Sequence, residues 1–231
     1  MGTEVRVVRG RAASVEADRE FTADLLAGAK TGQPALRVWR PHRQVAFGPR
    51  DVHSDGYDRA REIAADRDYA VCERSVGGRA VAYTGTTVSF ARIEPVDDMR
   101  EGVQQRYATA RVDLRAALGD LGVDARRGEP EGSFCPGSQS LQAGRSGKLV
   151  GIAQRVQQGA AMVAGVVIVD DHDEIAATLA PIYDALDLDF DPRSVGSIAR
   201  AGGEPDPVGA ILRIEDELLG DRLATVEWIG E

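Results

Sequence analysis

The feature that most constrains the fold is an apolar run in the second half of the chain. Residues 160–169 read AAMVAGVVIV and include no charged side chain. A strand that is apolar along its whole length is typical of one buried on both faces. Such a strand needs a neighbouring strand on each side and helices against the sheet. The run therefore predicts a layered fold with this strand near the centre.

A long amphipathic helix is predicted over residues 98–121. Its apolar side chains recur at three- and four-residue steps, which places them on one face of the helix, and Gly122 ends the pattern. The apolar face consists of Val103, Tyr107, Leu114, Leu118 and Leu121. We expect this helix to pack on one side of the sheet.

Short strands and helices fill the rest of the chain. Strands are expected near 80–84, 86–92 and 148–157, the first two joined by a turn at Gly85. Further helices are expected over 14–32, 56–69 and 206–220, and from Asp173. Together these elements predict an α+β fold, in which one mixed, mostly antiparallel β-sheet carries packed helices.

Composition excludes several classes of protein. The formal net charge of −9 argues against a nucleic-acid-binding protein, since such proteins need a basic face. No stretch approaches the ~18 consecutive apolar residues of a membrane span. The two cysteines, Cys72 and Cys135, are too few for a disulfide framework and too far apart for a metal site, so no metal is expected. The expected location is the cytoplasm.

The first candidate site is the loop RSVGGRAVAY, residues 74–83. Its paired glycines, Gly77 and Gly78, would let the backbone approach a ligand, and Arg74 and Arg79 would supply cationic donors for a phosphate or carboxylate. The same pattern also fits a tight hairpin with solvated arginines. It is not a dinucleotide-binding motif, because the third glycine and the following helix are missing.

The second candidate is Cys135 in the segment SFCPGS, residues 133–138. A cysteine in a Pro/Gly loop becomes a nucleophile if a neighbouring base or cation favours the thiolate. No histidine lies nearby in the sequence, so any such partner must come from the fold. An inert cysteine is the alternative.

The third candidate is Lys148 in GKLVGIAQRV, residues 147–156. The chain contains 28 lysines and arginines, of which only Lys30 and Lys148 are lysine. A lysine between Gly147 and Gly151, at the start of a strand, can present a compact point charge to a phosphate or a carbonyl oxygen. Since arginine fills nearly every other basic position, a surface role explains this lysine less well than a chemical one.

In this order, the three loops resemble those of the lipoate–protein ligase and octanoyltransferase family, which shares the biotin/lipoate ligase catalytic domain. The family's Arg-Arg-x-Ser-Gly-Gly-Gly-Ala-Val loop aligns with ERSVGGRAV, and its Lys-x-x-Gly-Ser-Ala-x-Arg motif aligns with KLVGIAQR. The matching residues are Arg74, Gly77, Gly78, Ala80, Val81, Lys148, Gly151, Ala153 and Arg155. The resemblance implies one catalytic domain over residues 1–231, without the separate C-terminal accessory domain of the longer ligases.

Some positions depart from the family pattern. Tyr83 and Thr84 replace a His-Asp pair, Ala164 replaces the histidine of a His-Gly step, and Ile152 replaces the serine of the lysine motif. Aligned on Phe134 and Ser138, the nucleophile position of one octanoyltransferase branch falls on Ser133, two residues before Cys135.

The resemblance implies a role for each candidate. Lys148 is the expected catalytic residue, contacting the acyl carbonyl and the phosphate of acyl-AMP. The expected substrate- and adenylate-binding residues are Arg74, Val76, Gly77, Gly78, Arg79, Ala80, Gly151 and Ala153. Cys135 is the possible nucleophile of the alternative route.

Three functions follow. The leading one is a ligase that uses ATP with Mg and lipoate, through lipoyl-AMP, to attach a lipoyl or octanoyl group to a lysine of a carrier domain. The second is an octanoyltransferase that needs no ATP and forms a thioester on Cys135. The third is a non-catalytic relative that binds an acyl group or a partner, which Val76, Tyr83 and Ala164 favour. Expected partners are a lipoyl carrier domain, from a 2-oxoacid dehydrogenase or the glycine cleavage system, and possibly acyl carrier protein.

Overall fold

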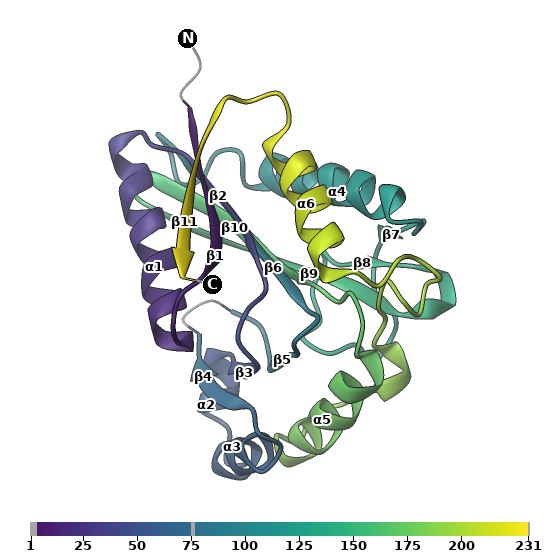
Figure 1. Ribbon diagram of the computed structural model, residues 1–231. Coiled ribbons are helices and arrows are strands. Elements are labelled where there is room, and N and C mark those ends of the chain that lie inside the picture. The colour runs from purple at the N-terminus through teal and green to yellow at the C-terminus, as the bar shows by residue number, and fades with distance from the viewer. Residues whose placement is uncertain (1–3, 75–76, 231) are drawn as a thin grey trace.

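Two sheets and their helices build the molecule (Figure 1). A computed structural model describes residues 4–74 and 77–230. In this part of the chain the strands form a sheet of eight and a second sheet of three. Helices cover both faces of the large sheet, and the small sheet lies below it in Figure 1, beside further helices.

The large sheet runs in the order β11-β1-β2-β6-β10-β9-β8-β7. Strand β1 pairs in parallel with β11 and β2, whereas the other neighbours are antiparallel. In chain order its strands are β1 (Val5–Arg11), β2 (Ala35–Trp39), β6 (Val88–Pro95), β7 (Arg126–Arg127), β8 (Leu141–Gln142), β9 (Lys148–Gln157), β10 (Ala160–Val167) and β11 (Ala224–Gly230). The apolar run thus forms β10, between β6 and β9, and the predicted mixed, mostly antiparallel sheet is confirmed.

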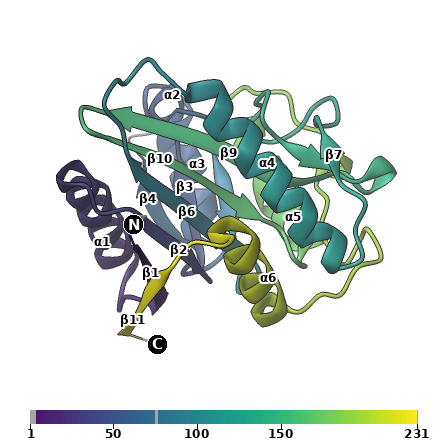
Figure 2. The ribbon, with the colours of Figure 1, turned by 90° about the horizontal axis from the view of Figure 1, so that it is seen from above.

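Two helices cover one face of this sheet, as Figure 2 shows from above. They are α4 (Val103–Asp120) and α6 (Pro207–Leu219), which pack against each other and against the sheet. Leu114 and Leu118 of α4 and Ile214 of α6 are fully buried there against strand residues such as Phe90. The predicted position of the long helix beside the sheet is confirmed, although α4 begins at Val103 rather than at 98.

Helix α1 (Val15–Gly28) covers the opposite face near β6 and β10. Ser14 caps it as its side chain accepts a hydrogen bond from the Ala17 amide at 3.2 Å. Leu25 and Leu26 are buried against strand residues such as Ile93. A short 3-10 turn, η1 (Ala29–Thr31), ends this segment.

The small sheet runs in the order β4-β3-β5, with β3 parallel to β4 and antiparallel to β5. It forms a second core with neighbouring helices, in which Phe47, Ile63 and Ile182 are buried. The elements of this part are β3 (Gln44–Phe47), α2 (Pro49–Val52), α3 (Tyr57–Ala65), β4 (Ala70–Glu73), β5 (Val81–Tyr83) and α5 (His172–Ala185). Two further 3-10 turns are η2 (Gly144–Ser146) and η3 (Pro192–Ser194).

The expectation of one sheet with a hairpin at Gly85 is therefore wrong. Strand β5 belongs to the small sheet and β6 to the large one, so the segment 84–87 crosses from one sheet to the other. Thr84, at this crossing, is fully buried. Its hydroxyl lies 3.1 Å from that of Thr86, and its carbonyl accepts a hydrogen bond from the Thr87 hydroxyl at 3.0 Å. These bonds stabilise the crossing where a hairpin turn was expected.

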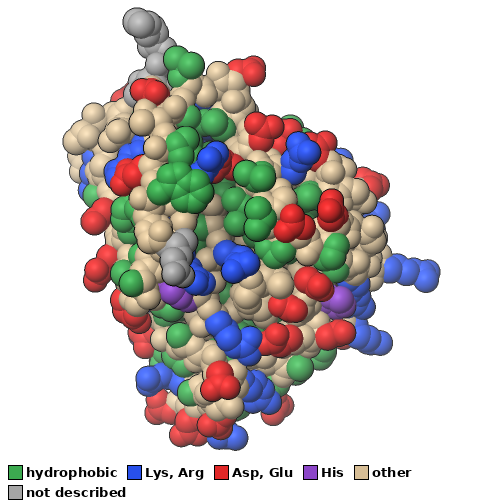
Figure 3. All heavy atoms as spheres, in the orientation of Figure 1, with side chains coloured by type: hydrophobic (Ala, Val, Ile, Leu, Met, Phe, Trp, Pro, Cys, Tyr) green, Lys and Arg blue, Asp and Glu red, His purple; other side chains and the backbone are tan. Residues whose placement is uncertain are grey.

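On the face shown in Figure 3, hydrophobic side chains gather over β11 and α6 among acidic and basic ones. Trp228 is 70% exposed and Leu223 75%.

Among residues 4–74 and 77–230, no helix combines the length and the apolar character needed to cross a bilayer.

Candidate active site

A cleft of about 660 Å³ lies between the sheets and beneath α1. One part of it is apolar, with Leu26, Trp39, Met162 and Val166 among its lining residues. These residues come from α1 and from β2 and β10 of the large sheet. An apolar wall of this kind fits a hydrocarbon chain better than a polar metabolite.

The other part of the cleft holds most of the residues that the sequence singles out. Arg74, Gly77, Cys135, Lys148, Gly151 and Ala153 all line it. The loops after β4, before β8 and at the start of β9 therefore meet at one place. Val76 lies outside the described residues.

Gly78 lies directly against Cys135. A Cβ built on Gly78 would be 2.8 Å from the Cys135 sulfur and 2.7 Å from Nη2 of Arg74. The φ angle of Gly78 is +114°, which side-chain-bearing residues rarely adopt. Glycine is needed here because the backbone approaches the sulfur so closely.

The Cys135 sulfur receives two hydrogen bonds. Nη2 of Arg74 and the backbone N–H of Arg79 each lie 3.3 Å from Sγ. The Arg74 guanidinium also bonds the Arg79 carbonyl oxygen, which joins the two donors. A cationic side chain and an amide dipole are therefore both directed at this sulfur. This is the kind of environment in which a cysteine acts as a nucleophile.

The charge of Arg74 depends on the same contact. Burial opposes its charged form, but the pKa of Arg74 is nevertheless raised, because the Cys135 sulfur and the Tyr83 hydroxyl lie close to the guanidinium. Burial in the cleft also raises the pKa of Tyr83 to about 12. Arg74 therefore stays a cation beside the sulfur, and Tyr83 stays neutral.

Arg79 and Ala80, two other predicted binding residues, make contacts outside the cleft that hold the loops around Cys135. The Arg79 side chain bonds Oδ1 of the buried Asp51 at 3.1 Å, which holds the loop in place. The Ala80 carbonyl accepts a hydrogen bond from the Tyr183 hydroxyl at 3.0 Å. The same hydroxyl accepts one from the Cys135 amide at 2.6 Å. Tyr183 therefore joins the loop that contains Gly77 and Gly78 (the glycine loop, residues 74–83) to the loop that contains Cys135 (the cysteine loop, residues 128–140).

Lys148 is buried, with 1% of its surface exposed. Its ammonium bonds Glu129 Oε2 at 2.8 Å, the Phe134 carbonyl at 3.0 Å and the Cys135 carbonyl at 2.9 Å. It also lies 4.8 Å from the centre of the Phe134 ring. The ammonium is thus directed at the cysteine loop from within the protein.

Sequence reasoning missed Glu129, Asp51 and Tyr183. Glu129 lies in the same Gly/Pro-rich segment as Cys135, residues 128–138, and this shared segment is a signal that could have drawn attention to it. No local pattern relates Asp51 or Tyr183 to the site. Ser133, where the family alignment puts the nucleophile, is buried, and its hydroxyl has no hydrogen-bond partner among the described residues.

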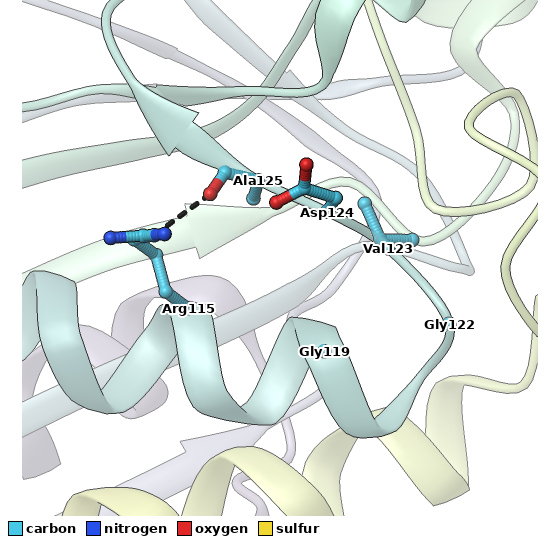
Figure 4. Close-up of a pocket in the computed structure, with 6 residues that line it drawn as sticks. All are labelled: Arg115, Gly119, Gly122, Val123, Asp124 and Ala125. Carbon is cyan, nitrogen blue, oxygen red and sulfur yellow. Dashed lines mark hydrogen bonds between the residues drawn. The ribbon is translucent and has the colours of Figure 1, made fainter.

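A second, shallower hollow of about 390 Å³ lies at the end of α4 (Figure 4). Its lining includes Arg115, whose side chain bonds the Ala125 carbonyl at 2.8 Å, and Asp124. None of the predicted site residues contributes to it.

Among the described residues no group of three or more His, Cys, Asp or Glu side chains could hold a metal ion.

Residues 14–205 match the protein family described as the lipoyl protein ligase A/B catalytic domain. The chain belongs to this family. Its members are enzymes of protein lipoylation, both ligases and acyltransferases, so the family suggested by the three loops is confirmed.

Curated relatives and solved structures agree with this assignment. The octanoyl-[GcvH]:protein N-octanoyltransferase of Geobacillus kaustophilus is 27% identical over 205 residues, 87% of this chain and 68% of its own. The enzyme of the same name from Oceanobacillus iheyensis is 23% identical over 81% of this chain and 68% of its own.

Among solved structures, a lipoate–protein ligase A bound with ATP superimposes with a TM-score of 0.72 at 19% identity, over 100% of this chain and 90% of its own. The putative lipoate protein ligase Ta0514 of T. acidophilum, with bound lipoic acid, gives a TM-score of 0.70 at 20% identity, over 100% and 91%. These likenesses confirm the predicted fold class.

Proposed function

We propose that this enzyme transfers an octanoyl group between carrier proteins through a thioester on Cys135. The observation that carries the proposal is the environment of Cys135, which lines the cleft and whose sulfur receives hydrogen bonds from Arg74 and the Arg79 amide. The relatives named above point the same way, since each is named as an octanoyltransferase that uses octanoyl-GcvH.

The reaction would run in two steps. The Cys135 thiolate attacks the carbonyl carbon of the octanoyl amide on the donor lysine, an S–C bond forms, and the C–N bond breaks as the donor amine takes up a proton. The amine of the acceptor lysine then attacks the thioester, loses a proton, and releases the thiolate. The apolar wall that includes Trp39 and Met162 would hold the hydrocarbon chain throughout.

The donor and acceptor follow from the relatives. We propose a GcvH-type glycine cleavage carrier protein as donor, rather than the acyl carrier protein considered from the sequence. The acceptor would be a lysine of a lipoyl domain, such as that of a 2-oxoacid dehydrogenase. This reaction consumes no ATP.

The ATP-dependent route remains the other prediction from the sequence, and the Lys148 contacts favour it less. An ammonium has three N–H donors, and Lys148 directs them at one carboxylate and two carbonyls of the cysteine loop. To contact an acyl carbonyl or a phosphate, Lys148 would have to give up one of these bonds. The thioester route needs no such change.

One experiment separates the two routes. The protein is incubated with octanoylated GcvH and unmodified lipoyl domain, without nucleotide, and the mass of each protein is measured. We expect the octanoyl mass to move from GcvH to the lipoyl domain. Modification that requires free octanoate or lipoate together with ATP and Mg would instead support the ligase route.

A trapping experiment tests the thioester itself. Octanoyl-GcvH alone should add one octanoyl group to the protein, in a bond that hydroxylamine cleaves. Cys135→Ser should abolish this adduct. The chain's other cysteine, Cys72, is buried and donates a hydrogen bond to Gln44 Oε1, so Cys72→Ser should retain it. An adduct that persists in Cys135→Ser would contradict the proposal.

A further inference from the structure

Glu129 uses both of its carboxylate oxygens within the cysteine loop. Oε1 accepts a hydrogen bond from the Gly137 amide at 2.7 Å. Oε2 accepts one from the Ser140 hydroxyl at 2.7 Å and another from the Lys148 ammonium at 2.8 Å. Glu129 therefore contacts both the segment that follows Cys135, at Gly137 and Ser140, and the start of strand β9, at Lys148.

Lys148 completes the connection from the other side. Its ammonium bonds the carbonyls of Phe134 and Cys135, two successive residues. An ammonium this deeply buried needs a charged partner, because an unpaired charge in the protein interior is strongly unfavourable. Among the described residues, the carboxylate paired with Lys148 is that of Glu129.

The cysteine loop has a conformation that must be held. Cys135 has a φ angle of +40°, in the left-handed region that residues with a side chain adopt at a cost of about 1 kcal/mol or more. The Cys135 amide is bonded to Tyr183 and its carbonyl to Lys148. In this conformation the sulfur lies 3.3 Å from both Nη2 of Arg74 and the Arg79 amide nitrogen.

We propose that Glu129 is a positioning residue for Cys135: by holding Lys148 and the Gly137 amide, it keeps the sulfur between Arg74 and the Arg79 amide. Glu129 acts through these contacts, not on the acyl group. Lys148 has the same positioning role, as the cation that joins Glu129 to the two loop carbonyls. The inference rests on the proposed function in taking Cys135 as the reacting thiol.

The test is Glu129→Gln, which keeps the length of the side chain but removes its charge. We measure the rate at which iodoacetamide alkylates Cys135 at neutral pH, read by peptide mass, together with kcat and KM of octanoyl transfer. Because misplacing a reacting group by about 1 Å costs about 100-fold in catalysis, we expect kcat to fall by about 10- to 100-fold with KM little changed. We expect alkylation to slow as well, since the displaced sulfur loses its contacts with Arg74 and the Arg79 amide. Wild-type alkylation in folded Glu129→Gln would overturn the proposal.

Glu131→Gln is the matched control, because Glu131 lies in the same loop with its side chain exposed. It should leave the alkylation rate and octanoyl transfer unchanged. Equal losses in Glu131→Gln and Glu129→Gln would mean that the net charge of the loop matters, not the Glu129 contacts, and would overturn the proposal.

Glu129→Gln leaves the Lys148 charge unpaired, so the protein could fail to fold. The double variant Glu129→Gln/Lys148→Met removes both charges, which restores stability in other buried pairs. We expect it to fold and still to alkylate slowly at Cys135. Wild-type alkylation in the folded double variant would overturn the proposal.

The alkylation rate separates this inference from the proposed function. If the wild type transfers no octanoyl group but Glu129→Gln still slows alkylation of Cys135, the positioning role stands and the transferase proposal fails. If transfer requires Cys135 but Glu129→Gln does not change the alkylation rate, the transferase proposal stands and the positioning role fails.

Discussion

At the residue scale, Gly78 leaves no room for a side chain beside the Cys135 sulfur and the Arg74 guanidinium. We predict that Gly78→Ala lowers octanoyl transfer by about 100-fold or more, because its Cβ would lie 2.8 Å from Sγ and displace it. The positive φ adds about 1–3 kcal/mol of destabilisation. Transfer rate and melting temperature are the measurements.

Gly77→Ala is the matched control for this prediction. A Cβ on Gly77 would meet no heavy atom within 4 Å, so the change should leave the melting temperature nearly unaltered and cost far less activity. Equal activity in the two alanine variants would show that the contact between Gly78 and the sulfur is unimportant.

A second prediction concerns the two kinds of change at Lys148. Lys148→Met should destabilise the protein by about 3–5 kcal/mol, since it leaves the Glu129 carboxylate without its buried partner. Lys148→Arg keeps the charge, but the longer, planar guanidinium cannot occupy the site of the ammonium between two carbonyls and a carboxylate. We therefore expect Lys148→Arg to fold and to lose about 100-fold in transfer.

Urea unfolding and the octanoyl transfer assay measure these two effects. A fully active Lys148→Arg would show that the site tolerates any cation, and the rarity of lysine in the chain would then need another explanation.

Residue-level prediction from the sequence succeeded where a residue was unusual for this chain. Lys148 was conspicuous because arginine fills almost every other basic position, and Cys135 because of its Pro/Gly loop. The contacts of Glu129 and Tyr183 could not be found in this way. They are formed across 19 and 48 residues of sequence, and only the folded chain brings the partners together.

At the element scale, helix α1 is attached to the sheet by a buried ion pair. The Arg37 side chain of β2 has no exposed surface, and its Nη2 lies 2.5 Å from Oδ1 of Asp18 in α1. The guanidinium also stacks on Trp39, 4.2 Å from the ring centre, so the pair stands next to the apolar wall of the cleft.

We predict that Arg37→Met destabilises the protein by about 3–5 kcal/mol, because it leaves Asp18 buried and unpaired. The exposed pair of Arg59 and Glu62 in α3 is the matched control, and Arg59→Ala should change stability by less than about 1 kcal/mol. Denaturant unfolding measures both. Similar values for the two variants would mean that the buried pair contributes no more than a surface one.

Elements with local signals were predicted well. Ser14 and Asp206 cap α1 and α6 as their sequences indicate, and the long apolar run lies in the centre of the large sheet. The error at Gly85 has a physical reason. A short polar turn between two apolar runs has the same pattern whether the chain reverses within one sheet or crosses to another.

At the scale of the whole molecule, the pairing of distant strands could not be predicted. Strand β1 pairs with β11 across most of the chain, in parallel, and the small sheet joins β3, β4 and β5. Such pairings depend on which apolar faces meet after the helices pack, and no local pattern records this. The sequence therefore predicted the loops that line the cleft, but not the strands that form its walls.

The last prediction concerns stability at high pH. Burial raises the pKa of all five tyrosines of the chain, to about 12 for Tyr69 and Tyr83. In the unfolded chain tyrosine has a pKa of about 10. Above that pH the unfolded state loses protons that the folded state keeps, so the contribution of the tyrosines to the free energy of unfolding should be constant below about pH 10 and fall as the pH rises towards 12.

Two titrations measure this effect. Tyrosinate absorbance of the folded protein should rise later than that of the protein in concentrated urea, where it should follow a pKa of about 10. Urea unfolding at increasing pH should show the loss of stability over the same interval. If the folded protein ionised its tyrosines near pH 10 with its circular dichroism unchanged, the tyrosines would have to be hydrated, and the burial of Tyr69 beside α5 and of Tyr183 behind the cysteine loop would be contradicted.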